Sequence, residues 1–391
     1  MNLKKQLLFL FVFILGPLVS LGNSEPEIHF NPADYVYLYE ANGDKGYYDA
    51  LLHFIGFVNR RDGNITVDSA IIDAVKDTRV LLRVFLARQD LEEAAGKGYK
   101  MQSSGLVQLY DVYFRSRSFL GESVTLSPTR KLSPNTALIS MRNYLTVKGI
   151  PDYFQVTLYY KTDDNATHEV SARLKAVVYQ QVNRFVFPVN GSWWVAGSAD
   201  PHSDHRWMTC EEFALDLGQL DQKGSTYKGH GVRLEDYYCF DREVVAVAEG
   251  EVVTVQNNRP DERSFLKQSG ESLEDYENRS REFQLEILKT DIYLALGNYI
   301  VIRHLGDEYS CYAHLKQGSA RVKRGDAVKK GQVIGNVGQS GNSTEPHLHF
   351  QVNDGPDPLY SRCKPVKFSN LRLFEDGSDS FIYAGDIVNT D

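Results

Sequence analysis

The sequence predicts an all-β protein, with a β-sandwich-like N-terminal domain followed by a compact antiparallel β-sheet domain. The chain has 391 residues, more than one domain typically holds. Its 23 tyrosines and 20 phenylalanines far outnumber its 4 methionines, a composition that favours strands. Short segments in which apolar and polar residues alternate recur along the chain, separated by turn-forming residues, as half-buried strands require.

The N-terminal domain is expected over residues 25–190. Alternating segments at residues 35–39, 106–110 and 153–160 each predict a strand. Residues 90–97 are the one helical candidate in this series. Several short strands at this spacing favour a sandwich of immunoglobulin-like proportions. No cluster of catalytic side chains occurs here, so we expect this domain to act as a spacer or to position a substrate.

The N-terminus has the pattern of a secretory signal peptide, predicted over residues 1–22. Lys4 and Lys5 precede an apolar run at residues 7–19, which is followed by small and polar residues. A retained N-terminal anchor is the alternative. No second long apolar stretch follows, so we expect an exported protein, periplasmic or extracellular, without a stable membrane span in the mature chain.

Charge and cysteine content exclude some classes of function. The formal net charge is -8, and such an acidic chain is not expected to bind nucleic acid, because phosphate contacts need clustered lysine and arginine. Composition leaves the oligomeric state open. None of the cysteines has the spacing of a metal knuckle. We expect structural roles for all of them, as buried thiols or with one disulfide: Cys210, Cys239, Cys311 and Cys363.

The strongest chemical signal is the pair His347 and His349. Residues two apart on a strand share one face, so both imidazoles are expected to point into one site, with Leu348 on the opposite, core face. His314 follows another predicted strand and adds a third imidazole. Such a pair alone is weak evidence for a metal site, so the surrounding sequence has to support it.

The second domain is expected over residues 191–370. Strand-turn-strand patterns at residues 244–253 and 322–335 contain glycines that favour tight turns. Residues 257–289 form a charged stretch with little periodicity, predicted to be a surface insertion and a possible lid or wall of a cleft. Residues 371–391 are expected to form a C-terminal tail.

Five motifs in order make this half resemble a lysostaphin/LytM-type zinc metallopeptidase, a peptidoglycan endopeptidase family. They are V-x-A-x-x-x-G from Val244, G-N-x-x-x-I from Gly297, Y-A-H-L from Tyr312, V-x-x-G-x-x-V-x-x-G-Q-x-I-G from Val322 and S-T-x-P-H-L-H-F from Ser343. The resemblance does not cover the N-terminal domain.

The resemblance implies roles for the three histidines. His349 resembles the family's zinc ligand, and His314 and His347 resemble its catalytic pair. Zn²⁺ is the only cofactor implied. Two histidines and one aspartate leave a fourth zinc position open for water, as in catalytic zinc sites.

The resemblance implies two further zinc ligands, a histidine and an aspartate near the start of the domain. In the family three residues usually separate these two ligands, and this sequence has no pair with that spacing before residue 244. His205 with Asp216 is the favoured pair, because residues 213–217 alternate so that Asp216 lies on the polar face of a plausible strand. His230 with Asp236 is the alternative, in a polar segment without strand periodicity.

The function implied by the resemblance is a zinc-dependent endopeptidase that hydrolyses peptide cross-links of bacterial peptidoglycan. The partners would then be peptidoglycan peptides. Two alternatives stay open: a catalytically inactive wall-binding or regulatory relative, and a secreted protease acting on Gly-rich proteins. A biotinyl or lipoyl carrier domain shares the glycine pattern of residues 322–335, but its lysines lack the hairpin-tip setting of a modified lysine.

Overall fold

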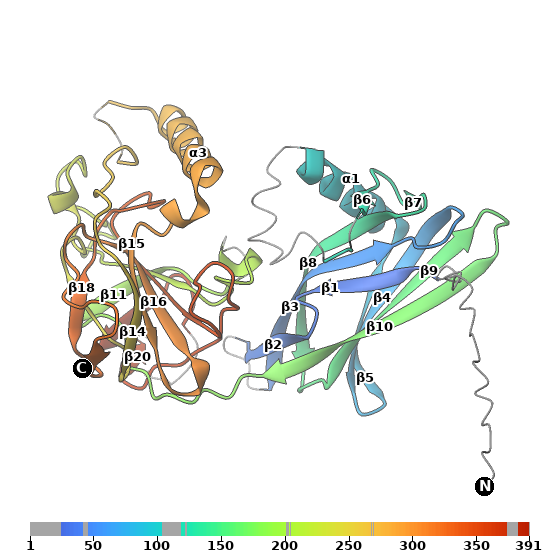
Figure 1. Cartoon of the computed structure of the whole chain (residues 1–391), viewed down its shortest axis with the longest axis horizontal. Coiled ribbons are helices and arrows are strands. Elements are labelled where there is room, and N and C mark those ends of the chain that lie inside the picture. The colour runs from blue at the N-terminus through green and yellow to red at the C-terminus, as the bar shows by residue number, and fades with distance from the viewer. Residues whose placement is uncertain are drawn as a thin grey trace, which may run out of the picture.

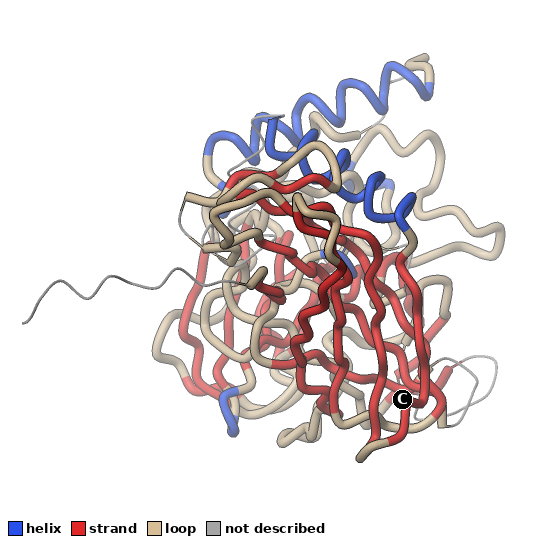
Figure 2. Tube along the Cα trace, turned by 90° about the vertical axis from the view of Figure 1, so that its right-hand side faces the viewer, coloured by secondary structure: helices blue, strands red, loops and turns tan. Residues whose placement is uncertain are grey.

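The computed structural model describes residues 25–41, 46–103, 119–121, 123–200, 203, 205–266, 268, 270–373 and 382–390. The signal peptide predicted at residues 1–22 and the strand predicted at residues 106–110 lie outside these ranges. Figure 1 shows two β-rich lobes joined by the segment after β10, and Figure 2 shows strands through both lobes, with helices along one edge. The all-β class is confirmed, since α1 and α3 are the only α-helices in the described chain.

The N-terminal lobe holds one ten-stranded sheet with the strand order β5-β4-β9-β10-β2-β3-β8-β6, to which β1 adds beside β3 and β7 beside β4. The pairs β10–β2 and β6–β8 are parallel, and the other pairs are antiparallel. Its strands are β1 (Glu27–Asn31), β2 (Tyr35–Glu40), β3 (Tyr47–Val58), β4 (Ile65–Lys76), β5 (Arg79–Leu86), β6 (Thr125–Leu126), β7 (Lys131–Leu132), β8 (Thr136–Lys148), β9 (Tyr153–Thr162) and β10 (Thr167–Val178).

This sheet closes over its own core, which gives the sandwich-like shape predicted from the sequence. Leu52 and Val147, from β3 and β8, share one buried cluster with Ile72 and Val156, from β4 and β9. Helix α1 (Arg88–Ser103), which contains the predicted helical segment, adds Leu91 and Ala95 to the same cluster. Strands far apart in the sheet order therefore bury one continuous apolar core.

The C-terminal lobe holds a nine-stranded sheet with the strand order β17-β14-β15-β16-β19-β12-β11-β21-β20, antiparallel throughout as predicted, and a separate β13–β18 pair. Its strands are β11 (Ser192–Gly197), β12 (Leu215–Gly218), β13 (Glu243–Val245), β14 (Gly250–Gln256), β15 (Asn298–Arg303), β16 (Tyr309–Leu315), β17 (Ala327–Val328), β18 (Val333–Asn336), β19 (Leu348–Asn353), β20 (Leu371–Leu373) and β21 (Ile387–Thr390). Strands β20 and β21 come from the segment expected to be a tail, and they extend the sheet at one edge.

Four 3₁₀ turns and one helix complete this lobe. The turns are η1 (His205–Trp207), η2 (Leu234–Asp236), η3 (Ile292–Leu294) and η4 (Leu305–Asp307). The segment predicted to be an aperiodic insertion instead contains helix α3 (Leu273–Thr290). Ser272 caps this helix by accepting a hydrogen bond from the backbone N–H of Asp275, which satisfies one of the free donors at the helix start.

The two lobes meet through a tyrosine-rich cluster. Tyr37 and Tyr39 on β2 pack with Phe213 and Cys363 of the C-terminal lobe. The connection between the lobes is fixed at its start by Glu308, which is fully buried. Its carboxylate accepts hydrogen bonds from the Tyr179 hydroxyl and from the backbone N–H groups of residues 182 and 183. Packing at this cluster holds the lobes together, and a buried carboxylate fixes the start of the connection between them.

The cysteines and the helices bear on two further expectations. All four cysteines are free thiols and buried, in agreement with the first of the two predicted alternatives. None of the helices in the described ranges is both long and apolar enough to cross a membrane.

Candidate active site and metal centre

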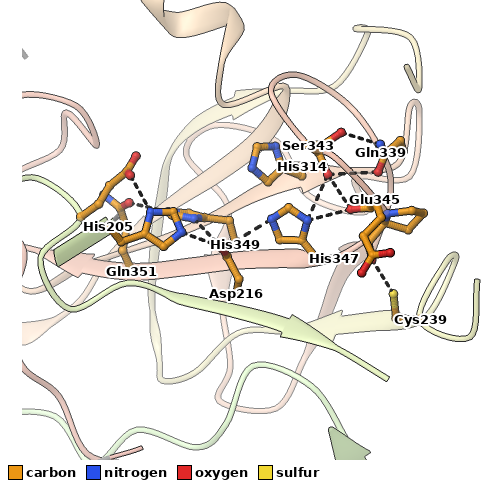
Figure 3. Close-up of polar contacts among 12 residues, drawn as sticks. His205, Asp216, Cys239, His314, Gln339, Ser343, Glu345, His347, His349 and Gln351 are labelled. Atoms are coloured by element: carbon orange, nitrogen blue, oxygen red, sulfur yellow. Dashed lines mark hydrogen bonds and ion pairs between the residues drawn. The ribbon is translucent and has the colours of Figure 1, made fainter. Parts of the chain in front are cut away.

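The register of three adjacent strands creates the site. Strand β19 lies between β12 and β16, and His349 pairs with Asp216 on one side and Ala313 on the other. Directly opposed residues in antiparallel strands have Cβ atoms about 5 Å apart, so Asp216 and His349 necessarily meet on one face. His347 lies just before β19 and His314 just after Ala313. The alternation predicted from the sequence therefore brings Asp216, His347 and His349 together on one face, and the His314 ring lies beside them (Figure 3).

His205 reaches the same point from η1. Its Nε2 lies 2.6 Å from Oδ2 of Asp216, and Nδ1 of His349 lies 3.0 Å from Oδ1 of the same carboxylate. One ligand atom from each of these three residues lies within 4.8 Å of the others. Two imidazole nitrogens and one carboxylate oxygen at this spacing match the donor set of a catalytic zinc site, so the residues present fit the ion.

Each candidate histidine ligand has a polar partner behind it. Nδ1 of His205 lies 2.9 Å from Oε2 of Glu211, a carboxylate that accepts the ring proton and leaves Nε2 free for a metal. Nε2 of His349 lies 2.7 Å from Oε1 of Gln351. The amide nitrogen of Gln351 faces the backbone carbonyls of Cys210 and Pro358, which only accept, so its oxygen must face His349 and accept the ring proton. Nδ1 of His349 is then free for the metal.

The other two histidines present the same nitrogen to the cleft. Nδ1 of His314 donates to the Ser340 carbonyl at 2.8 Å, and Nδ1 of His347 donates to the Glu345 carbonyl at 2.8 Å. Nε2 of each ring is therefore the unprotonated atom when the ring is neutral. The ring centres of His314 and His347 are 4.8 Å apart.

The backbone at His314 has an uncommon conformation. Its φ of 58° lies in the left-handed region that few residues other than glycine adopt. The backbone N–H of His314 donates to the Leu296 carbonyl, and its own carbonyl accepts from Gly338, so both neighbours hold this conformation. Strained residues of this kind cluster at functional sites, and here the strain turns the ring toward the cleft.

Charge and burial have opposite effects on the pKa values of Asp216 and His205 and act together on that of His314. Burial alone would raise the pKa of Asp216, but His205 and His347 hold it well below its usual range. Burial would lower the pKa of His205, but Asp216 and Glu211 raise it well above its usual range. Burial, together with the neighbouring His347 and His349, holds the pKa of His314 well below its usual range. Two carboxylates beside His205 thus form an anionic point that attracts a cation.

These side chains line a cleft of about 690 Å³. Its walls come from the segment before β12, the end of α3 with η3, and the loop before β19, represented by Met208, Gln284, Ile292, Asn342 and Thr344. The insertion predicted as a possible lid or wall therefore contributes one wall of the cleft. This volume lies within the range of about 300–1,000 Å³ that is typical of ligand-binding clefts.

The alternative pair from the sequence does not enter this site. His230 is exposed, and Asp236 accepts a hydrogen bond from the backbone N–H of Arg233 at the start of η2. His304 is buried elsewhere, between the Glu249 carbonyl and the Ser310 hydroxyl.

Sequence reasoning missed Glu211 and Gln351. Gln351 could have been found, because it is the third residue, after His347 and His349, on one face of the same strand. Glu211 has no such signal, because it lies in a turn after η1.

A histidine-rich cleft on an antiparallel sheet, with a two-histidine, one-aspartate donor set, is typical of metal-dependent hydrolases. Residues 286–361 match the family model of peptidase family M23. Residues 286–361 thus carry an M23 peptidase domain, which confirms the resemblance stated from the motifs.

Curated relatives match short parts of this chain. The chain is 46% identical over 55 residues to the peptidoglycan DD-endopeptidase ShyC of Vibrio cholerae, covering 14% of this chain and 12% of that protein. It is 37% identical over 70 residues to the cell division protein DipM of Caulobacter vibrioides, covering 18% and 11%. These matches span about a tenth of each relative's length.

Among solved structures, a zinc-containing peptidase from Vibrio cholerae covers 85% of this chain and 84% of its own, with 14% identity and a TM-score of 0.26. The catalytic domain of lysostaphin from Staphylococcus simulans covers 44% and 88%, with 19% identity and a TM-score of 0.24.

Proposed function

We propose that the protein is a zinc-dependent endopeptidase that hydrolyses peptide cross-links of bacterial peptidoglycan. The observation that carries this proposal is the convergence of His205, Asp216 and His349 on one point, with His314 and His347 beside it in a single cleft. The peptidoglycan endopeptidase relatives support the substrate class. The signal peptide predicted at residues 1–22 supports export to the periplasm or the cell exterior, where that substrate is found.

In this proposal His205, Asp216 and His349 hold the zinc ion. Bound zinc would acidify a coordinated water and polarise the scissile carbonyl. Glu211 and Gln351 fix the two ligand rings by accepting their outward protons, so that each ring presents one defined nitrogen.

His314 and His347 would move protons and bind developing charge. Each ring is anchored through Nδ1 to a backbone carbonyl and presents Nε2 to the cleft. One ring accepts a proton from the attacking water, whose oxygen adds to the peptide carbonyl carbon. The C–N bond then breaks, and the leaving amine takes up a proton from an imidazole. The other ring, when protonated, stabilises the oxyanion by a hydrogen bond.

The domain organisation belongs to the same proposal. Residues 25–190 would form the N-terminal domain and residues 191–370 the peptidase domain, with the insertion at about residues 257–289 forming a wall of the cleft. A single peptide strand between cross-linked glycan chains could then lie along this wall and reach both catalytic histidines.

The test is zinc content together with release of soluble fragments from purified peptidoglycan. About one zinc per chain and release of muropeptides are expected for the mature protein. His349→Ala and Asp216→Ala should lose both, and His230→Ala, which changes the alternative ligand, should retain both.

Each other outcome has a defined meaning. Loss of zinc in His230→Ala but not in Asp216→Ala would reject the assigned ligands. A folded protein with zinc and no release from peptidoglycan would reject the substrate, and a Gly-rich protein would be the next substrate to test. A folded protein with neither zinc nor activity would be a wall-binding or regulatory relative.

A further inference from the structure

The segment from η1 to β12 has two faces with matched chemistry. His205 and Glu211 face the cleft and are hydrogen-bonded to each other. Arg206 and Glu212, the next residue in each case, face the N-terminal lobe and form a buried ion pair. One short segment therefore joins a candidate metal ligand to the contact between the lobes.

Arg206 is fully buried against aromatic rings of both lobes. Its guanidinium carbon lies 4.7 Å from the ring centre of Tyr39 and 5.8 Å from that of Tyr144, both in the N-terminal lobe. The ring of Phe213 lies 5.1 Å away on its own lobe. Stacking on aromatic faces stabilises a guanidinium by cation–π attraction, most strongly where water is excluded.

The charge of Arg206 depends on one carboxylate. Within the described chain, Nε and Nη2 of Arg206 have no hydrogen-bond partner, so the ion pair with Glu212 and the aromatic rings compensate its lost hydration. Glu212 is also fully buried, and its second oxygen lies 3.8 Å from Nε2 of His53 on β3. Removing either partner alone would leave an uncompensated buried charge.

The N-terminal lobe also holds the residue after Arg206. The guanidinium carbon of Arg142, on β8, lies 4.5 Å from the ring centre of Trp207. Two of the three residues of η1 are thus held by the N-terminal lobe, and the third is His205. Because η1 is a single turn, a shift of Arg206 or Trp207 would displace the His205 ring.

We propose that Arg206 is a positioning residue for the metal centre, through which the N-terminal lobe fixes the His205 ligand. This inference rests on the proposed function for the identity of the ligand and adds a role for the N-terminal lobe. That lobe then acts as a structural part of the active site as well as a spacer.

The test uses the full chain and measures zinc dissociation by competition with a chelator dye. The double variant Arg206→Met/Glu212→Leu removes both charges and keeps the volume, which avoids leaving one charge unpaired. Zinc affinity should fall about 10- to 100-fold, as for loss of groups that orient a metal ligand. Hydrogen exchange in residues 205–213 should become faster.

Arg362→Met is the matched control. Arg362 is fully buried in the same contact between the lobes and stacks on Tyr35 and Tyr37, at 4.3 Å and 4.6 Å, but it is not adjacent to a candidate ligand. Its loss should weaken the contact between the lobes and change zinc affinity less than about threefold. Equal loss of zinc affinity in this control would overturn the proposal, because general loosening of the contact would then suffice.

Arg142→Ala keeps the test decisive if the double variant fails to fold. Arg142 is exposed, so its truncation should not affect folding, and zinc affinity should fall about 2- to 5-fold through Trp207. Unchanged zinc affinity and unchanged exchange in the variants would reject the proposal. Native protein that binds zinc but leaves peptidoglycan intact would reject only the proposed substrate. Native protein that binds no zinc would reject both proposals.

Discussion

Replacement of Gln351 by leucine tests whether the hydrogen bond behind the His349 ring supports the proposed metal centre. The Gln351 side chain is buried, and its oxygen accepts the Nε2 proton of His349 at 2.7 Å. Its amide nitrogen lies 3.0 Å from the Cys210 carbonyl, 2.8 Å from the Pro358 carbonyl and 2.8 Å from Oδ1 of Asn353. Leucine has a similar volume and none of these polar atoms.

The expected cost follows from which groups lose a partner. The Cys210 carbonyl keeps a hydrogen bond from Nδ2 of Asn353 at 2.9 Å. The Pro358 carbonyl, Oδ1 of Asn353 and the His349 ring N–H all lose their bond to Gln351. A buried polar group left unsatisfied costs about 1–3 kcal/mol, so the free energy of unfolding should fall by about 3–9 kcal/mol. Zinc affinity should fall about 10- to 100-fold, because the ring of His349 is no longer fixed.

The assay compares denaturant unfolding of the zinc-free chain with zinc affinity from chelator competition. Asn353→Leu is the matched control: Asn353 is buried, lies on the same strand face and bonds to the same Cys210 carbonyl, but does not touch His349. It should lose stability and keep zinc affinity within about threefold. If Gln351→Leu binds zinc as tightly as the native protein, or if both variants lose affinity equally, the reasoning fails.

Three further outcomes are expected. Free zinc at about 100 times its Kd contributes about 2.7 kcal/mol to stability, so its removal by a chelator should lower the melting temperature by about 5–10 °C. Calorimetry of His349→Ala should show no such shift. Burial, reinforced by Arg206 and Arg362, holds the pKa of His53 well below 6.5, so the unfolded chain binds the proton first as pH falls. The native protein should therefore lose up to about 1.4 kcal/mol of stability per pH unit below 6.5. In His53→Gln, the difference in unfolding free energy between pH 7 and pH 5 should be smaller by about 2 kcal/mol. The same difference in both proteins would contradict this prediction. Glu308→Gln should lower the free energy of unfolding by about 1.5–3 kcal/mol for each charge-assisted hydrogen bond lost at the connection between the lobes, and it should leave zinc affinity unchanged. Equal midpoints of urea unfolding for the variant and the native protein would contradict this prediction.

The C-terminal sheet could be predicted because its signals are local. Alternation and glycine turns indicated short antiparallel strands, and the structure has β14, β15, β16 and β19 in those places. The period of two also put His347 and His349 on one face, and the register then brought Asp216 opposite His349. His205 was chosen as the partner of Asp216 because residues 213–217 alternate, and no periodicity indicated the turn η1 that carries His205.

Helix α3 was missed although a signal was present. Ser272 is followed three residues later by Asp275, which is typical of a helix start. Leu273, Tyr276 and Phe283 also recur at helical spacing, but many charged residues between them obscure the pattern. A mostly polar helix of this kind is stabilised by its contacts with the lobe more than by its own sequence.

The left-handed backbone at His314 and the buried pair Arg206–Glu212 could not be predicted, because both depend on tertiary partners. From the sequence alone, an arginine and a glutamate six residues apart are expected to be exposed to solvent. What decides their burial is β2, where three tyrosines at alternate positions share one face. The alternation correctly indicated a strand, but it did not say that this face would meet another lobe. Two tyrosines of that face stack on Arg362, and the third stacks on Arg206. The alternation that forms the strand therefore also supplies the aromatic surroundings in which Arg206, next to the candidate zinc ligand His205, can be buried.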